Sequence, residues 1–296
     1  MNPGKQFREA VAQNELLQCL GTTTAYHALL AEKSGAKALY VSGGGVAAGS
    51  LGVPDLGIST LNDVAVDVER ICSHTSLPVL VDIDTGWGGS FNIARAINTL
   101  EKAGAAAIHI EDQIQQKRCG HRPNKALVSK SEMLDRIKSA VDARISDDFV
   151  IMARTDSLAQ QGLEAAIDIM GACVDAGADM VFPEAVSELA VYKKITESIA
   201  VPVLANITEF GVTPLFTTDE LISADVKIAL YPLSAFRAAN QAALNVYQKI
   251  ITTGSQQAAI EAMQTREELY QYLGYHEYEQ QLDQLFSKEG DDVNSI

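Results

Sequence analysis

Short apolar runs rich in β-branched residues recur eight times along the chain, and each precedes a stretch with the apolar period of a helix. The runs are LQCLGT (17–22), ALYVSG (38–43), PVLVDID (78–84), AAIHIED (106–112), FVIMARTD (149–156), MVFPEA (180–185), PVLANIT (202–208) and KIALYP (227–232). Strands this apolar are typical of a parallel sheet that helices cover. The repeated strand–helix pattern predicts an α/β protein with the (β/α)8 architecture of TIM-type barrels.

Helix signals separate the predicted strands. The segment 61–74, for example, carries apolar residues at helical spacing. Gly35, Gly104 and Gly177 each precede an alanine and a predicted strand, where glycine can adopt the left-handed conformation that ends a helix. Neither a composition shift nor a Pro-rich linker divides the chain, so the sequence predicts a single barrel domain over residues 1–296.

The chain from about residue 234 to its end has a helical pattern, which is more helix than one barrel needs. Apolar and tyrosine side chains in the segment 256–286 require a surface to cover. That surface belongs either to the chain's own barrel or to a neighbouring subunit that receives the helix in exchange. Residues 234–296 are therefore predicted to form a C-terminal helical extension.

A doubly wound sheet that binds a dinucleotide is the rival fold, because GGGVAA (43–48) fits the pattern G-x-G-x-x-A after a strand. The glycines follow the second predicted strand, however, and the next helix is expected only from about Leu61. No acidic residue ends the following strand at the distance that ribose recognition requires. The barrel is the favoured interpretation.

Composition excludes several classes of partner. The chain has 296 residues, 47% of them hydrophobic and 21% charged, and a formal net charge of -15 that repels nucleic acid and anionic membranes. We find no stretch with the length of a membrane span and no apolar signal segment at the start. The four cysteines lie far apart, which predicts neither a disulfide framework nor a thiolate zinc site. We expect a cytoplasmic protein.

Polar residues gather where the predicted strands end, which is where barrel enzymes carry their active sites. Asp82 and Asp84 are two residues apart on a strand, so their carboxylates project to the same side and can grip a hard cation. The lack of a histidine cluster favours Mg²⁺ or Mn²⁺ over zinc, and Asp55 and Glu111 add further carboxylates. Two helix-capping aspartates are the alternative. His109 is interpreted as a hydrogen-bonded core residue.

The segment QQKRCGHRPNKALVSK (115–130) concentrates positive charge in an acidic protein. Its cations are Lys117, Arg118, His121, Arg122, Lys125 and Lys130. Cations around Cys119 favour its thiolate, which predicts a reactive thiol, although a merely solvated basic loop is the alternative. Together with Arg154 and Arg237, these cations would attract a small acid with several carboxylates. Its glycine and polar content predicts that the loop closes over substrate.

Motifs over almost the whole chain resemble those of the isocitrate lyase and phosphoenolpyruvate mutase superfamily. They are SGGGVAAGSLGVPDLGIST (42–60), HIEDQ (109–113), CGHRPNK (119–125), MARTD (152–156), FPEA (182–185), NITEFG (206–211) and LYPLSAFRA (230–238). KRCGH (117–121) resembles the lyase signature, which usually reads KKCGH in isocitrate lyases. The resemblance implies a barrel whose eighth helix is exchanged with a neighbouring subunit, usually in a homotetramer.

The resemblance also implies the roles of individual residues. It implies Mg²⁺ near Asp82 and Asp84, with Asp55 and Glu111 in the outer sphere. It implies catalytic roles for Cys119 as proton donor, Tyr40 as candidate base, Lys117, His121 and Glu111. It implies substrate contacts from Ser42, Gly43, Gly44, Gly120, Arg154, Glu184, Asn206, Ile207, Thr208, Arg237 and Arg266, while Phe182, Leu230 and Pro232 shape room for a substrate methyl group.

The implied reaction is the cleavage of 2-methylisocitrate, a small tricarboxylate, to pyruvate and succinate in the methylcitrate cycle of propionate catabolism. The cysteine loop favours a lyase over phosphonomutases and oxaloacetate decarboxylases, which lack it. Isocitrate is the alternative substrate, because a methyl group in an apolar pocket gives only about 1–3 kcal/mol of discrimination. Aldol-type transfer or decarboxylation of a keto acid is the rival chemistry, and a non-catalytic ligand-binding barrel is the rival to an enzyme of any kind.

Overall fold

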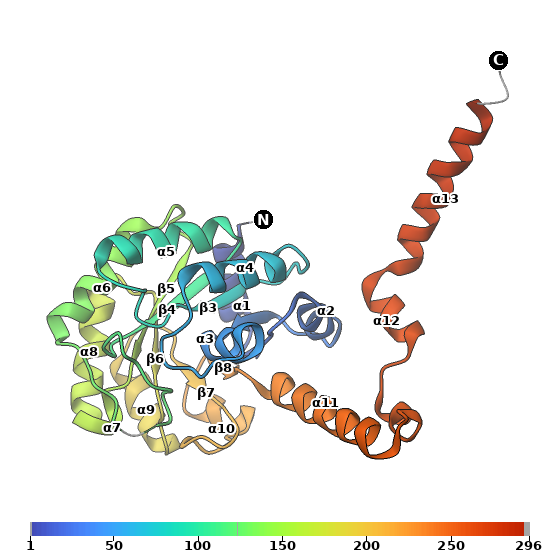
Figure 1. The fold of residues 1–296 in the computed structure, drawn as a ribbon. Helices are drawn as coiled ribbons and strands as arrows, with labels where there is room; N and C mark the ends of the chain where they lie inside the picture. Colours follow the sequence, from blue (N-terminus) through green and yellow to red (C-terminus); the bar gives the residue numbers. More distant parts are fainter. Residues whose placement is uncertain (1, 123, 293–296) are drawn as a thin grey trace. The chain divides into compact units, whose positions relative to one another are not determined.

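Eight parallel strands form the wall of a barrel in the computed structural model, which describes residues 2–122 and 124–292 (Figure 1). They are β1 (Leu17–Gly21), β2 (Ala38–Val41), β3 (Val79–Asp82), β4 (Ala107–Glu111), β5 (Val150–Thr155), β6 (Met180–Pro183), β7 (Leu204–Asn206) and β8 (Ile228–Tyr231). Their order in the sheet is β6-β5-β4-β3-β2-β1-β8-β7, and a parallel bridge from Val181 to Val203 connects the two ends. Each strand lies within one of the apolar runs, so the predicted (β/α)8 fold is confirmed.

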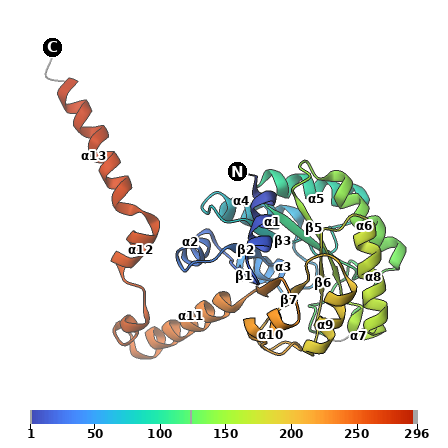
Figure 2. The same ribbon diagram turned by 180° about the vertical axis from the view of Figure 1, so that it is seen from behind.

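Helices precede, connect and follow the strands, and most of those that connect two strands pack against the outside of the sheet (Figures 1 and 2). They are α1 (Pro3–Gln13), α2 (Ala25–Lys33), α3 (Gly43–Val46), the π-helical turn η1 (Ala47–Leu51), α4 (Leu61–Cys72), α5 (Ser90–Lys102), α6 (Lys130–Ala143), α7 (Leu158–Gln161), α8 (Leu163–Asp175), α9 (Leu189–Ser198), α10 (Thr218–Ser223) and α11 (Ser234–Thr253). Gly35, Gly104 and Gly177 have φ values of 95°, 99° and 107°, which confirms the predicted left-handed helix ends. Within the described residues, we find no helix with the length and apolar character to cross a membrane.

The helix after β2 begins earlier than predicted. α3 starts at Gly43, directly after the strand, and Ser42 caps it by accepting a hydrogen bond from the N–H of Gly45 at 3.2 Å. The expectation that no helix precedes Leu61 is therefore wrong, because three successive glycines carry no helical sequence signal. The doubly wound alternative is excluded, since all eight strands belong to one barrel.

Alternate strand residues fill two kinds of core. Side chains such as Leu80, Met152 and Phe182 pack together inside the barrel, whereas Val81 and Ile151 pack outward against the helices. Side chains alternate in this way because successive residues of a strand point to opposite faces of the sheet. The carboxyl ends of the strands lie beyond this packed core and can carry polar groups.

Helix α1 covers the amino-terminal end of the barrel (Figure 2). Phe7 of this helix is fully buried in the interior cluster. Arg8 donates hydrogen bonds to the Asp148 carbonyl and the Asp179 carboxylate, both at 2.8 Å. With that end filled, the opposite end is where a ligand can enter.

The chain divides into two compact units, residues 1–237 and 238–296. The second unit holds the rest of α11, the 3₁₀ turn η2 (Gln257–Ala262), α12 (Arg266–Leu273) and α13 (Tyr275–Asp292), so the helical character predicted from residue 234 is confirmed. The division falls inside α11, close to the predicted start of the extension at residue 234. The predicted single domain over 1–296, with 234–296 as an interface extension, stays a prediction.

Candidate active site

A cavity of about 320 Å³ lies where the carboxyl ends of the strands meet. Most residues predicted for the site line it: Tyr40, Ser42, Gly44, Asp55, Asp82, Lys117, Cys119, Gly120, His121, Arg154, Phe182, Glu184, Asn206, Thr208, Pro232 and Arg237. Five others, Gly43, Asp84, Glu111, Ile207 and Leu230, are buried without being part of this lining. The structure therefore brings residues from all parts of the barrel sequence to one place.

Arg266 is separate from this group. It begins α12 in the second unit, at residues 238–296. Its substrate contact stays a prediction.

The cavity also includes residues that the sequence analysis did not single out. Glu209 and Phe210 directly follow Thr208 in the NITEFG motif, so their position after a strand end was the available signal. Glu209 Oε2 lies 3.7 Å from Arg237 Nε, and the Arg237 guanidinium lies over the Phe210 ring at 5.7 Å from its centroid. These contacts hold Arg237 at the rim, where it can contact an anionic ligand.

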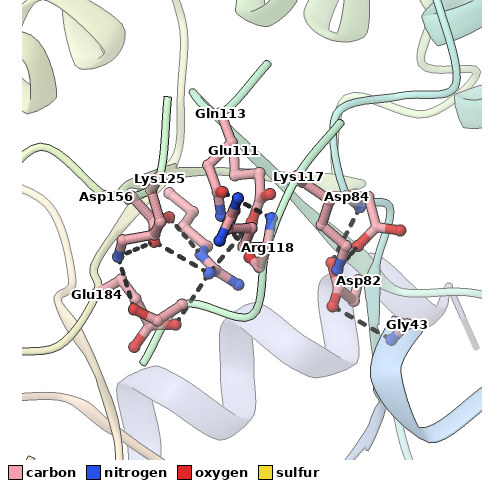
Figure 3. A network of polar contacts seen from close by, with 12 residues as sticks. Gly43, Asp82, Asp84, Glu111, Gln113, Lys117, Arg118, Lys125, Asp156 and Glu184 are labelled. Carbon is pink, nitrogen blue, oxygen red and sulfur yellow. Dashed lines mark hydrogen bonds and ion pairs between the residues drawn. The ribbon is translucent and has the colours of Figure 1, made fainter. Parts of the chain in front are cut away.

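Asp82 and Asp84 direct their carboxylates toward the same point of the backbone. A Cβ atom on Gly43 would lie 3.2 Å from Asp82 Oδ2 and 3.1 Å from Asp84 Oδ1, so a side chain here would press against both oxygens. The Gly43 N–H donates to Asp82 Oδ2 at 3.2 Å (Figure 3). Neither aspartate is the N-cap of the helix that follows β3, since α5 begins at Ser90 with Gly89 as its N-cap. The helix-capping alternative is therefore wrong.

Lys117 places its ammonium between two of the predicted metal-site carboxylates. Its Nζ lies 2.5 Å from Asp55 Oδ1 and 2.5 Å from Asp84 Oδ1, and its side chain is only 4% exposed. Burial raises the pKa of Asp84 to about 7, and the negative charge of Asp82 adds to this effect. For Asp82, burial acts in the same direction, but interaction with the protonated form of His109 and with the charges of Lys117 and Arg154 outweighs it and lowers the pKa to about 2. The cluster thus concentrates negative charge around one cation.

This arrangement fits a divalent cation that prefers oxygen ligands. In the described part of the chain, no three His, Cys, Asp or Glu side chains are spaced to hold a metal ion, and Lys117 Nζ bridges the carboxylates of Asp55 and Asp84. The donor set nevertheless consists of hard carboxylate oxygens, and the buried Glu111 Oε1 has no hydrogen-bond partner. Asp82 and Asp84 are the residues that would hold such an ion once Lys117 withdraws.

Arg154 forms the centre of a second buried charge network, whose carboxylates Glu111, Asp156 and Glu184 are labelled in Figure 3. Its guanidinium lies 3.2 Å from Glu111 Oε2, 3.0 Å from Asp156 Oδ2 and 3.1 Å from Glu184 Oε2. Burial raises the pKa of Glu111 well above its usual range, although the charge of Arg154 opposes this. Burial would also raise the pKa of Asp156, but the charges of Arg154 and Lys125 lower it. Three carboxylates on one guanidinium leave the site short of positive charge.

Tyr40 is buried beside this acidic cluster. Its hydroxyl lies 2.9 Å from His109 Nε2 and 3.4 Å from Asp82 Oδ2. Burial raises the pKa of Tyr40 well above its usual range and lowers that of His109 to about 4, so both are neutral near pH 7. A neutral phenol donates a hydrogen bond, which argues against Tyr40 as a tyrosinate base. His109 is fully buried and hydrogen-bonded, as predicted.

The basic loop after β4 folds back on itself and reaches the barrel. A bridge between Gln113 and Leu127 forms its base, and the Arg122 N–H donates to the Cys119 carbonyl at 2.8 Å to form a turn. Cys119 is exposed on this turn and lines the cavity. Lys117 and Lys125 direct their ammonium groups at carboxylates instead of the thiol, because a buried ammonium requires a paired charge.

His121 docks the turn against the floor of the cavity. The Val212 N–H donates to His121 Nδ1 at 3.0 Å, so the ring proton of neutral His121 lies on Nε2. That nitrogen lies 3.4 Å from Glu184 Oε1 and 3.3 Å from the Asn206 amide nitrogen. His121 therefore connects the loop to two strand ends, where it can also contact a ligand.

The fold and the site together define the class: an α/β-barrel enzyme with a carboxylate cluster and a cysteine-bearing loop at the catalytic end of the strands. The family model described as phosphoenolpyruvate phosphomutase matches residues 10–251. The chain belongs to this family.

Three relatives show how far the similarity extends. The chain is 60% identical over 288 residues to 2-methylisocitrate lyase of Escherichia coli strain K12, with 97% of each chain covered. A crystal structure of 2,3-dimethylmalate lyase has a TM-score of 0.89 at 34% identity and 96% coverage of each chain. Phosphonopyruvate hydrolase in complex with oxalate and Mg²⁺ has a TM-score of 0.84 at 27% identity, covering 94% of this chain and 97% of its own.

Proposed function

We propose that this chain is a carbon–carbon lyase that cleaves 2-methylisocitrate to pyruvate and succinate with Mg²⁺ or Mn²⁺ as cofactor. The observation that carries the proposal is the shared cavity, in which the Cys119 loop and the Asp82 carboxylate line the same space of about 320 Å³. The full-length similarity to a 2-methylisocitrate lyase supports this substrate over isocitrate. Phe182 and Pro232 line the cavity, where apolar side chains can receive a methyl group.

Asp82 and Asp84 would hold the cation, with Asp55 and Glu111 farther from it. When bound, the ion supplies Lewis-acid polarisation of the α-hydroxycarboxylate end of the substrate. Arg154 and Arg237 offer guanidinium groups to the carboxylates. Pairing of Arg154 with three carboxylates fixes its orientation before substrate arrives.

Cleavage requires a proton donor for the departing half. Once a base takes up the hydroxyl proton, the O–H electrons form the second C–O bond of the pyruvate keto group as the C–C bond breaks, and the electron pair of that bond remains on the succinate carbon. Asn206 and Thr208 line the cavity and can donate hydrogen bonds to this anion. Cys119 then gives its thiol proton to the carbon, which forms the new C–H bond and leaves a thiolate.

A product assay tests the function. Pyruvate and glyoxylate are measured with 2-methylisocitrate and with isocitrate, each with and without a chelator. We expect pyruvate and succinate in equal amounts from 2-methylisocitrate, lost on chelation. Glyoxylate formation at an equal or higher rate would make the chain an isocitrate lyase, and pyruvate without succinate would indicate transfer or decarboxylation.

The variant Cys119→Ser tests the proton donor. A serine hydroxyl is a far weaker acid than a thiol, so kcat should fall by about 10²- to 10⁴-fold while KM changes little. Turnover by Cys119→Ser at the wild-type rate would remove Cys119 from proton transfer.

We also propose a homotetramer in which the helical extension is exchanged between subunits. Within the second unit, Tyr247, Ile251, Leu285 and Phe286 are all more than half exposed, and apolar side chains at this density require a covering surface. Light scattering at micromolar concentration should give four times the chain mass of 31.7 kDa. A monomer mass would exclude the exchange.

A further inference from the structure

The peptide groups on both sides of Cys119 are held by buried side chains. On one side, Gln113 lies at the base of the loop and is completely buried. Its amide contacts both polar groups of the Arg118 main chain: Gln113 Nε2 donates to the Arg118 carbonyl at 2.9 Å, and the Arg118 N–H donates to Gln113 Oε1 at 3.0 Å (Figure 3). This pair of hydrogen bonds fixes the residue immediately before Cys119.

On the other side, Lys125 holds the residue immediately after Cys119. Its Nζ donates to the Gly120 carbonyl at 2.6 Å and lies 2.5 Å from Asp156 Oδ1. The side chain of Lys125 is 4% exposed, so this contact is shielded from water. Arg154 in turn holds Asp156 at 3.0 Å, which fixes the position of the anchor relative to the barrel floor.

The two anchors are themselves supported by the rigid part of the barrel. Arg136 of α6 donates to the carbonyls of Glu111 and Gln113, both at 2.8 Å. The loop therefore does not rely on its own hydrogen bonds alone. Loop residues are ordinarily the most mobile part of a barrel, whereas a group that transfers a proton must be held within a fraction of an ångström of its partner.

We propose that Gln113 and Lys125 are positioning residues that fix the main chain on either side of Cys119 and leave its sulfur free to face the cavity. The catalytic part of this inference rests on the lyase function proposed above. Neither Gln113 nor Lys125 is proposed to contact the substrate. Both act by restricting where the thiol can lie, so their loss should affect the proton-transfer step more than substrate binding.

The first test measures anchoring without any substrate. Trypsin cleaves after Arg118 only when that segment leaves the barrel and becomes extended. The variants Gln113→Met and Lys125→Met should be nicked between Arg118 and Cys119 about tenfold faster than wild type, as expected when the local opening equilibrium shifts by about 1.4 kcal/mol. Lys130→Met is the matched control, since its partner Asp168 is on the surface. Equal nicking in all four proteins would overturn the anchoring.

The second test separates positioning from a merely structural role. In D₂O, a fixed thiol delivers deuterium to one face of the carbanion, so wild type should give monodeuterated succinate of a single handedness. Both anchor variants should lower kcat by about 10- to 100-fold with KM nearly unchanged, and should give mixed handedness because water reaches either face. Variants that are nicked faster but keep wild-type kcat and handedness would overturn the positioning role.

The two tests also distinguish failure of this inference from failure of the proposed function. A wild-type chain that forms no succinate would refute the lyase function, while the nicking rates still decide whether Gln113 and Lys125 anchor the turn. Gln113 and Lys125 lie on opposite sides of Cys119 and hold different peptide groups. If one variant does not fold, the other can therefore still be compared with wild type in both tests. Circular dichroism identifies a variant that does not fold.

Discussion

Replacing Lys117 with methionine should strengthen the binding of Mg²⁺. The Lys117 ammonium lies 2.5 Å from both Asp55 and Asp84, so an ion that approaches these carboxylates must displace it. Breaking a buried ion pair costs about 3–5 kcal/mol. The cost for Lys117 should not exceed the lower end of this range, because the loop can open and the Asp55 side chain is 28% exposed. We therefore expect a contribution of roughly 1.4–3 kcal/mol, which corresponds to roughly 10- to 100-fold in affinity.

The single tryptophan of the chain provides the assay. Trp87 follows Asp84 by three residues, and its ring N–H donates to the Ser59 carbonyl at 3.1 Å, so it connects the segments that carry both aspartates. Titration of its fluorescence with Mg²⁺ gives the dissociation constant of wild type and Lys117→Met. Lys130→Met, which removes an exposed ammonium, controls for the change in net charge. A dissociation constant unchanged within twofold in Lys117→Met would refute the competition.

Two further predictions address the loop and the stability of the barrel. A Cβ atom on Gly120 would lie 2.5 Å from Glu184 Oε2, so Gly120→Ala should prevent closure of the loop and lower kcat/KM at least tenfold without changing the thermal midpoint. An unchanged kcat/KM would contradict this. Asp179 pairs with Arg8 at 2.8 Å and Arg144 at 3.1 Å, so Asp179→Ala should lower the free energy of unfolding by about 2 kcal/mol while kcat stays at the wild-type value. Thermal unfolding and turnover, measured on the same preparation, check this.

The strands were predictable because parallel barrel strands are buried on both faces, which makes their sequences almost continuously apolar. Each observed strand lies inside one predicted run, and the polar residue that ends it could be read directly, as at Asp82 and Glu111. The helix at Gly43 was missed because its glycines disfavour a helix locally. Gly43 leaves space for the close approach of the Asp82 and Asp84 carboxylates, a tertiary effect that the local sequence does not encode.

The pairing of the loop cations could not be predicted from the sequence. The sequence placed Lys117 and Lys125 near Cys119, and proximity along the chain suggested that they act on the thiol. Their partners are Asp84 and Asp156, which lie just after the ends of β3 and β5 and come close only when the barrel forms. The same limit applies to Gln113, whose role depends on where the returning loop places the Arg118 main chain.

The charge balance of the cavity constrains the order in which ligands bind. With the loop in place, Lys117 and Lys125 each pair with barrel carboxylates, and Arg154 is shared between Asp156, the partner of Lys125, and two more, Glu111 and Glu184. A tricarboxylate would add further negative charge to a site that already holds an excess, at a distance where little water screens it. Asp82 and Asp84 would be neutralised if they held a divalent cation, and Lys117 would then be free to leave Asp84 and face the substrate. The proposed function therefore requires the metal to bind before the substrate or together with it, and the tricarboxylate should bind only weakly in the presence of a chelator.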